Sequence, residues 1–368
     1  MEKGILSEVR EYHRSWTRII DCYVIPIAAV IVIITSVFVI VIYCKEYRTS
    51  KNKIRKVASL IYSAIGLSNI AAILPKAIIH TYAFTYGNVK MFVPLNLCRS
   101  WYFVQEFTKV PHCASILFVT LLSLQRYQII KHPFVGSQKW TVSKTISKII
   151  IVLIVSTLVS IISFIGSELV PYHVELKENT TASNSSFITC HAHFASWLGS
   201  YGMEVAIFIM ILKIATIILP SGLIILYCDI SLIIYLKMIT RVHHVMTHAS
   251  KTVIHHVVKD SFKSVPNKHD QQEDHPQILL ILILSLVVFI VEIPYTVFMF
   301  FQIYYWTLPS HESFTFFRIG PVRNTIDLSV VLSYPALFLA SCITSQRFRF
   351  MFRNLFKCKK GCLRNVQN

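Results

Sequence analysis

The sequence predicts an all-α membrane protein, a bundle of seven transmembrane helices followed by a short amphipathic helix on the cytoplasmic side. The 368 residues are 54% hydrophobic and only 15% charged, with a mean hydropathy of +0.57, whereas soluble domains carry about 25% charged residues. The chain also contains apolar stretches long enough to cross a bilayer, which takes about 20 residues. These observations exclude a soluble domain and a disordered chain.

Seven stretches qualify as membrane spans, and the third and seventh are the least apolar of them. The third carries Glu106, Lys109 and His112 in its first half, and the seventh carries Arg323 and Asp327 near its start. Charged side chains are costly in hydrocarbon, so within a span they are candidates for function. In chain order, the predicted spans cover approximately residues 23–44, 57–79, 101–129, 146–165, 205–236, 278–304 and 322–343.

The charge of the connecting segments predicts the orientation in the membrane. Residues 45–56 hold six basic residues against one acid, and residues 347–364 hold seven basic residues and no acid. By contrast, residues 168–200 hold one lysine against three glutamates. Positive segments stay on the cytoplasmic side, which places the N-terminus outside and the C-terminus inside. We therefore expect an extracellular N-terminus at 1–22, the seven-helix domain at 23–344 with a cytoplasmic loop at 237–276, and a cytoplasmic helix and tail at 345–368.

The outer loop at 168–200 carries two further features of an extracellular segment. Asn179 and Asn184 each begin an Asn-x-Ser/Thr sequon, which predicts N-glycosylation. Cys190 lies in the same loop and Cys98 lies just before the third span, so we expect these two cysteines to form a disulfide in an oxidising compartment. The chain contains no Cys-x-x-Cys pair, so a zinc site is not indicated.

The cytoplasmic segments give weaker signals. The loop at 237–275 holds seven of the fifteen histidines, which suits either a metal-binding tract or, more simply, a partly helical extension of the fifth span. Cys358 and Cys362 lie among lysines just past an amphipathic segment and are candidates for palmitoylation. Motifs for nucleophilic catalysis, phosphate binding or metal ligation are absent from the sequence, so we expect no enzyme, cofactor or metal site. The partner that the basic charge indicates is membrane lipid rather than nucleic acid.

The end of the third span carries the most specific motif. Gln125-Arg126-Tyr127, followed by His-Pro and Phe134, resembles the Asp-Arg-Tyr segment of rhodopsin-class G-protein-coupled receptors, with glutamine in place of the acid. The wider stretch, in which His112 precedes Ala-Ser-Ile and Gln-Arg-Tyr, is similar to the third helix of invertebrate myosuppressin, FMRFamide-like and sex-peptide receptors. Because Gln125 is neutral, it cannot form an ion pair with Arg126. The inactive state of the receptor is therefore expected to be stabilised less than in the parent class.

Matches to this group are scattered over roughly residues 23–356. Glu292 and Pro294 stand where the group has Glu-x-Pro in its sixth helix. The sequence departs from the class at Asn69, where most members have Asp, and at residues 337–341, which align with the Asn-Pro-x-x-Tyr segment without matching it. The resemblance implies a plasma-membrane receptor for a short amidated neuropeptide, signalling through a heterotrimeric G protein of the inhibitory type.

The resemblance also implies a ligand that ends in Arg-Phe-amide. A guanidinium is matched by a carboxylate that accepts two parallel hydrogen bonds, and Glu106 or Asp327 would supply it. Glu292 and Pro294 lie deeper and are expected to act as a switch, while the segment from Arg126 to Phe134 would face the G protein. The other expected ligand contacts are neighbouring polar and aromatic side chains, namely Trp101, Tyr102, Gln105, Lys109, His112 and Phe298.

Alternative interpretations stay open at this point. In the first alternative, the charged residues within the spans pair with one another rather than with a ligand. Examples are Lys109 with Glu292 and Lys213 with Glu204. A divergent chemosensory receptor for a small molecule would account for the departures from the class motifs. A seven-span transporter is the third alternative, but the few glycines disfavour the broken helices that transporters use.

Overall fold

The computed structural model describes residues 19–82, 95–165, 167–176, 185–194, 201–253, 274–306 and 315–356. Within these ranges, seven helices are long and apolar enough to cross a membrane. Each overlaps one predicted span, so the predicted seven-helix bundle is confirmed. The spans are Ile25–Thr49, Lys53–His80, Tyr102–Lys131, Val142–Ile161, Glu204–Tyr235, Ile278–Tyr304 and Thr325–Thr344.

The first two spans form an antiparallel pair, α2 (Ile25–Thr49) and α3 (Lys53–His80), with a short π-helical turn η1 (Ile20–Val24) before α2. The Asn52 side chain accepts a hydrogen bond from the Ile54 N–H at 2.9 Å and so caps the start of α3. Gly66 lets the two helices approach closely, because a Cβ there would lie 3.0 Å from the Ile40 side chain. Lipid is as apolar as the core, so close packing of this kind stabilises membrane helix pairs.

The third span consists of α4 (Leu95–Phe107) and α5 (Lys109–Lys131), separated by a turn at Thr108. Pro111 lies in the first turn of α5, where its missing N–H costs little. A short helix α6 (Pro133–Lys139) then leads to the fourth span, α7 (Val142–Ile165).

The fifth and seventh spans are irregular near prolines. The fifth consists of α8 (Gly202–Lys213), a π-helical turn η4 (Ile214–Ile218) and α9 (Leu219–Val253), and η4 precedes Pro220. The sixth span is the single helix α11 (Asp274–Trp306) with Pro294 inside it. The seventh comprises α12 (Thr315–Ser333) and α13 (Ala336–Thr344) and is followed by the amphipathic helix α14 (Gln346–Phe356).

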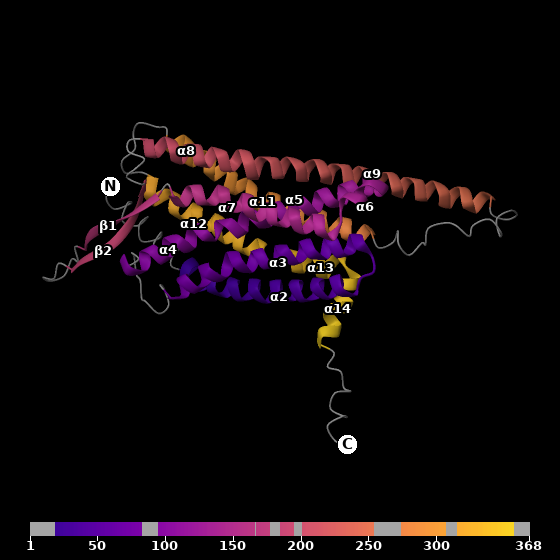
Figure 1. Cartoon of the computed structure of the whole chain (residues 1–368), viewed down its shortest axis with the longest axis horizontal. Helices are drawn as coiled ribbons and strands as arrows, with labels where there is room; N and C mark the ends of the chain where they lie inside the picture. Colours follow the sequence, from indigo (N-terminus) through magenta and orange to yellow (C-terminus); the bar gives the residue numbers. More distant parts are fainter. Residues whose placement is uncertain are drawn as a thin grey trace, which may run out of the picture.

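A two-stranded hairpin in the predicted outer loop is the one element type that the sequence analysis did not anticipate. β1 (Ser167–Leu176) pairs antiparallel with β2 (Ser185–Phe194). Figure 1 shows the hairpin at one end of the bundle, and α6 and α14 at the opposite end. We call these the hairpin end and the α14 end. The helix α9 continues beyond the bundle at the α14 end (Figure 1), in line with the expected helical extension of the fifth span.

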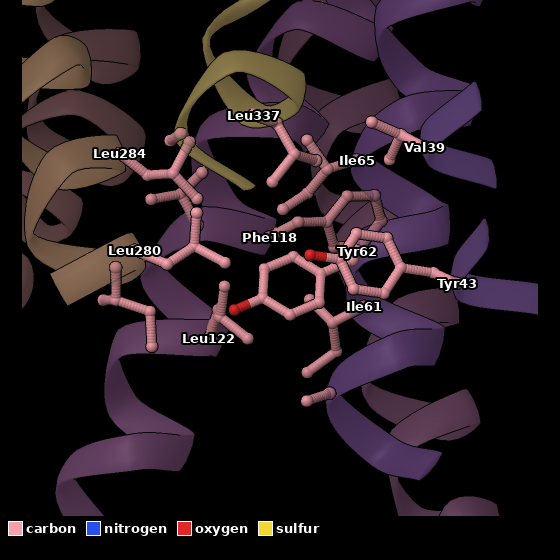
Figure 2. Close-up of a cluster of buried hydrophobic side chains, with 14 of the residues drawn as sticks. Val39, Tyr43, Ile61, Tyr62, Ile65, Phe118, Leu122, Leu280, Leu284 and Leu337 are labelled. Carbon is pink, nitrogen blue, oxygen red and sulfur yellow. The ribbon is translucent and has the colours of Figure 1, made fainter. Parts of the chain in front are cut away.

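The larger of the two hydrophobic cores lies towards the α14 end and joins seven helices, including α9 through Ile225 and α14 through Phe348 and Met351. Side chains from α2, α3, α5, α11 and α13 interlock there (Figure 2). Two aromatic rings at its centre, Tyr43 and Tyr62, stack with centroids 4.5 Å apart. The outward faces are apolar as well, since Ile27, Ile31 and Ile34 on α2 are at least half exposed. An apolar outer surface around a packed interior is what a helix bundle in lipid requires.

Candidate functional site

A chain of polar side chains crosses the interior of the bundle and links four helices. Glu292 of α11 lies with Oε1 3.2 Å from His112 Nε2 of α5, and His112 Nδ1 lies 3.2 Å from the Tyr334 hydroxyl. The main-chain oxygen of Tyr334 accepts a hydrogen bond from the Asn69 amide at 3.2 Å, and Asn69 Oδ1 accepts one from the Ser115 hydroxyl at 3.0 Å. These contacts couple the sixth span to the second, third and seventh.

The imidazole at the centre of this chain suits both neighbours in one tautomer. With its proton on Nε2, His112 donates a hydrogen bond to Glu292, and its Nδ1 accepts a hydrogen bond from the Tyr334 hydroxyl. The second carboxylate oxygen of Glu292, Oε2, is buried and has no hydrogen-bond partner among the described residues. Glu292, Asn69 and Ser115 contribute to the lining of a small cavity of about 50 Å³, whose other lining residues are mainly apolar. The centre of the bundle therefore holds a small pocket where a few polar side chains meet an otherwise apolar core.

The seventh span breaks at the edge of this pocket. Tyr334 and Pro335 interrupt the helix between α12 and α13, because proline has no N–H to continue the hydrogen-bond ladder. The break sets the Tyr334 oxygen towards Asn69. The proline break of this helix thus lies two residues before residues 337–341, which align with the Asn-Pro-x-x-Tyr segment of the class.

Three polar pairs lie between this pocket and the hairpin end. Lys109 forms an ion pair with Glu106, three residues earlier in the third span. Lys76 Nζ of α3 lies 3.6 Å from Asp327 Oδ2 of α12. The third pair joins the Gln105 amide of α4 to the His80 ring of α3, 3.4 Å apart. Of these groups, Glu106 keeps one buried carboxylate oxygen, Oε2, without a hydrogen-bond partner in the described part of the chain.

The observed pairs differ from the two pairings named from sequence. Lys109 contacts Glu106, and Glu292 contacts His112. The Lys213 ammonium donates to the Tyr295 hydroxyl at 3.3 Å, whereas Glu204 is exposed on α8. His112 was expected to contact the ligand. In the structure it contacts Glu292, the residue expected to act as a switch.

The expected aromatic contacts are distributed over several helices. The Tyr102 ring on α4 packs against Phe164 of α7, with centroids 6.2 Å apart. Phe298 is half-buried on α11, and Tyr304 is exposed near the end of that helix. Trp101 lies on α4, but its side chain is outside the described residues. Tyr102 thus faces the fourth span.

At the α14 end, Arg126 is buried. The residue before it is Gln125, where the Asp-Arg-Tyr segment has an acid. The guanidinium interacts with the Tyr62 hydroxyl and is only 5% exposed. Both polar atoms of the Gln125 side chain are buried and lack a hydrogen-bond partner within the described ranges. Tyr127 bonds through its hydroxyl to Tyr227 at 2.9 Å and to Lys131 at 2.7 Å.

The helix α6 is fixed closely against the end of α5. A Cβ on Gly136 would lie 2.6 Å from the main-chain oxygen of Gln128, so only glycine fits at this approach. The indole N–H of Trp140 donates to the Gln128 side chain at 3.0 Å, and the Lys148 ammonium lies 3.3 Å from the Trp140 ring centroid. Phe134 lies on α6, although its side chain is outside the description.

The structure combines a seven-helix bundle, a proline-broken seventh span, a buried arginine followed by tyrosine at the end of the third span, and an amphipathic eighth helix. The chain matches the 7 transmembrane receptor (rhodopsin family) over residues 37–322. It belongs to this family. No individual curated protein gives a significant match to the chain. The protein is thus a G-protein-coupled receptor, a multi-pass protein of the plasma membrane whose partners are a ligand and a heterotrimeric G protein.

Sequence reasoning missed several interior residues of this receptor. Ser285 of α11 donates to Asp229 of α9 at 3.4 Å and lies 3.5 Å from the Ser123 hydroxyl of α5. Lys76 is the single charge of the predicted span 57–79, and Asp229 lies in an apolar stretch 16 residues beyond Lys213, which was the signal that could have identified them. Among the described residues, no group of His, Cys, Asp and Glu is placed to hold a metal ion.

Other predicted sites of the receptor fall outside the described residues. The sequons at Asn179 and Asn184 and the tail cysteines Cys358 and Cys362 lie in undescribed segments. Cys98 lies on α4 and Cys190 on β2, but neither side chain is described. The backbones of α4 and β2 are in contact, so the expected disulfide stays a prediction that the placement of these two elements favours.

Proposed function

We propose that this receptor binds a short peptide ending in Arg-Phe-amide at the hairpin end and signals to an inhibitory G protein at the α14 end. The N-terminus is extracellular and the C-terminus cytoplasmic. The observation that carries the proposal is Glu106, whose carboxylate has one buried oxygen without a partner. A peptide guanidinium would supply the missing donor, since its N–H groups suit a carboxylate.

A second carboxylate and two aromatic rings support the same ligand chemistry. The Asp327 side chain is 31% exposed, so part of it stays accessible beside Lys76. Phe298 is half-buried on α11, where a Phe-amide ring can pack on it. Trp101 lies five residues before Glu106 on α4, whereas Tyr102 packs against Phe164 of α7. The cationic and aromatic groups of one short peptide thus have matching groups on α4, α11 and α12.

The route to the G protein follows the third and sixth helices. Glu106 and His112 are six residues apart in the third span, which is about 9 Å along a helix. His112 in turn contacts Glu292 on α11, two residues before Pro294, whose missing N–H removes one hydrogen bond of the helix. A ligand that displaces Lys109 from Glu106 would therefore act close to the contact that joins α5 to α11.

The test is a G-protein activation assay in cells that express the receptor, with a panel of Arg-Phe-amide peptides and their free-acid versions. We expect activation that needs the amide. Glu106→Gln should weaken it about tenfold to a hundredfold, because a hydrogen bond to a charged group contributes about 1.5–3 kcal/mol. Glu204→Gln is the matched control, since Glu204 is an exposed carboxylate on α8.

Two results would contradict the proposal. Equal activation by the amidated peptides and their free-acid versions would show that the receptor does not recognise the C-terminal amide. No response to any peptide, with surface expression verified, would favour a small-molecule chemosensory receptor instead. Pertussis toxin in the same cells tests the inhibitory G protein separately, because it should abolish the response.

A further inference from the structure

Lys213 introduces a positive charge between the third, fifth and sixth spans. It is half-buried at the end of α8, and its ammonium acts on the buried thiol of Cys113 on α5. It hydrogen-bonds to the Tyr295 hydroxyl of α11 at 3.3 Å. Within the described ranges, no carboxylate forms an ion pair with it, whereas Lys76 and Lys109 each have one.

The hydrogen-bonding capacity of this pair is only partly used. An ammonium has three donors, and the described residues supply one acceptor to Lys213, the Tyr295 oxygen. Because that oxygen accepts from Lys213, the Tyr295 hydroxyl keeps its own proton for another acceptor. The Lys213 ammonium and the Tyr295 hydroxyl therefore offer hydrogen-bond donors side by side. An anion with two oxygens, such as a carboxylate, could accept from both.

Glu292 precedes Tyr295 by three residues on α11, and its charge acts on Lys213. Its Oε1 contacts His112, however, and within the described residues it forms neither a hydrogen bond nor an ion pair with Lys213. A cation held inside a membrane bundle is costly unless an anion pairs with it. A ligand carboxylate that enters from the hairpin end would remove that cost, and its binding would be favoured for the same reason.

We propose that Lys213 and Tyr295 form a recognition site for a carboxylate of the ligand. The inference rests on the proposed peptide function and adds to it that the peptide carries an acidic residue besides its arginine. Cys113, on which the Lys213 charge acts, is seven residues beyond Glu106 in the third span, about 10 Å deeper. An extended peptide covers this distance in about three residues. Only one residue follows the arginine in such peptides, so the acid precedes the arginine by about three positions.

The first experiment tests the anion site without any peptide. The purified full-length receptor is unfolded thermally with phenylacetate, with phenylacetamide as the neutral probe, or with chloride. At tenfold excess over its Kd, phenylacetate should raise the unfolding temperature by about 3 °C, and phenylacetamide should not. Lys213→Met should abolish the shift, Lys213→Arg should keep it, and Tyr295→Phe should reduce it. Lys148→Met, which removes a lysine at the opposite end of the bundle, is the matched control and should keep it.

Two outcomes would overturn the carboxylate site. One is an absent shift, or a shift that persists in Lys213→Met. The other is an equal shift with chloride, which would make this an inorganic-anion site unrelated to ligand recognition.

The second experiment uses peptide pairs that differ only by Asp or Asn three positions before the arginine. We expect the Asp peptide to activate the wild-type receptor at a concentration at least about tenfold lower than the Asn peptide. Lys213→Met should remove the difference without abolishing surface expression. Equal activation by the Asp peptide and the Asn peptide would overturn the carboxylate site and leave the peptide function intact. Silence of all peptides, with the phenylacetate shift dependent on Lys213, would refute the peptide function and leave the carboxylate site standing.

Discussion

Replacing His112 by Phe should destabilise the receptor through the charge that it leaves behind. Phenylalanine keeps a ring of similar size beside Tyr334, whose ring centroid lies 6.1 Å from that of His112. It removes the 3.2 Å contact to Glu292 Oε1, and the other oxygen, Oε2, is already without a partner. Glu292 is 7% exposed, so bulk solvent does not reach the position of the lost donor.

The expected cost of His112→Phe is about 2–3 kcal/mol. A hydrogen bond to a charged group contributes about 1.5–3 kcal/mol, whereas neutral contacts between membrane helices average about 0.6 kcal/mol. The charged contact therefore accounts for most of the loss. With about 2 °C per kcal/mol for a large domain, the unfolding temperature should fall by about 4–6 °C.

A double-mutant cycle measured by thermal unfolding in detergent tests this reasoning. The variants are His112→Phe, Glu292→Met and the combination of the two. Since replacing both partners of a buried pair by apolar groups is nearly neutral, the double variant should be about 3 °C more stable than His112→Phe alone. Simple addition of the two single effects would refute the coupling between His112 and Glu292.

Three further predictions concern other parts of the fold. Tyr43→Phe removes the 2.9 Å hydrogen bond to Ser341 and should lower the unfolding temperature by about 2 °C; a loss of similar size in the Ser341→Ala background would show that this bond is not the cause. Gly136→Ala places a Cβ against a main-chain oxygen of α5, so G-protein activation should fall at unchanged surface expression; full activation would mean that α6 tolerates displacement. Cys98→Ser and Cys190→Ser should reduce surface expression equally, with no added loss when combined; additive losses would argue against a disulfide.

The spans were predictable because lipid imposes a simple requirement on sequence. A helix in hydrocarbon must be apolar over about 20 residues, and that pattern is local. All seven helices accordingly overlap the predicted spans. The hairpin was not predicted, because its strands lie in a loop where polar and apolar residues mix. Val170, Val174 and Ile188 were the available signal, since β-branched residues favour strands.

The interior charges were predictable from the sequence, but their contacts were not. Charged residues within apolar spans identified Glu106, Lys109 and Asp327, and the spacing of three residues was an unused signal for the pair of Glu106 with Lys109. The partner of Asp327 is Lys76 on another helix. The partner of Glu292 is His112. Such pairs depend on the rotation and depth of each helix, which local sequence does not encode.

Composition and local pattern established the membrane bundle and its candidate interior charges. The Arg-Tyr motif of the third span, by its resemblance, pointed to the receptor class to which the family match then assigned the chain. These conclusions rest on single helices, each of which satisfies its own backbone hydrogen bonds in lipid. Packing between helices determined the pairing of Glu292 with His112, the contact of Tyr334 with Asn69 and the hydrogen bond of Lys213 to Tyr295. A helix can turn about its axis in lipid at little cost, so these features arise only when several helices fix one another.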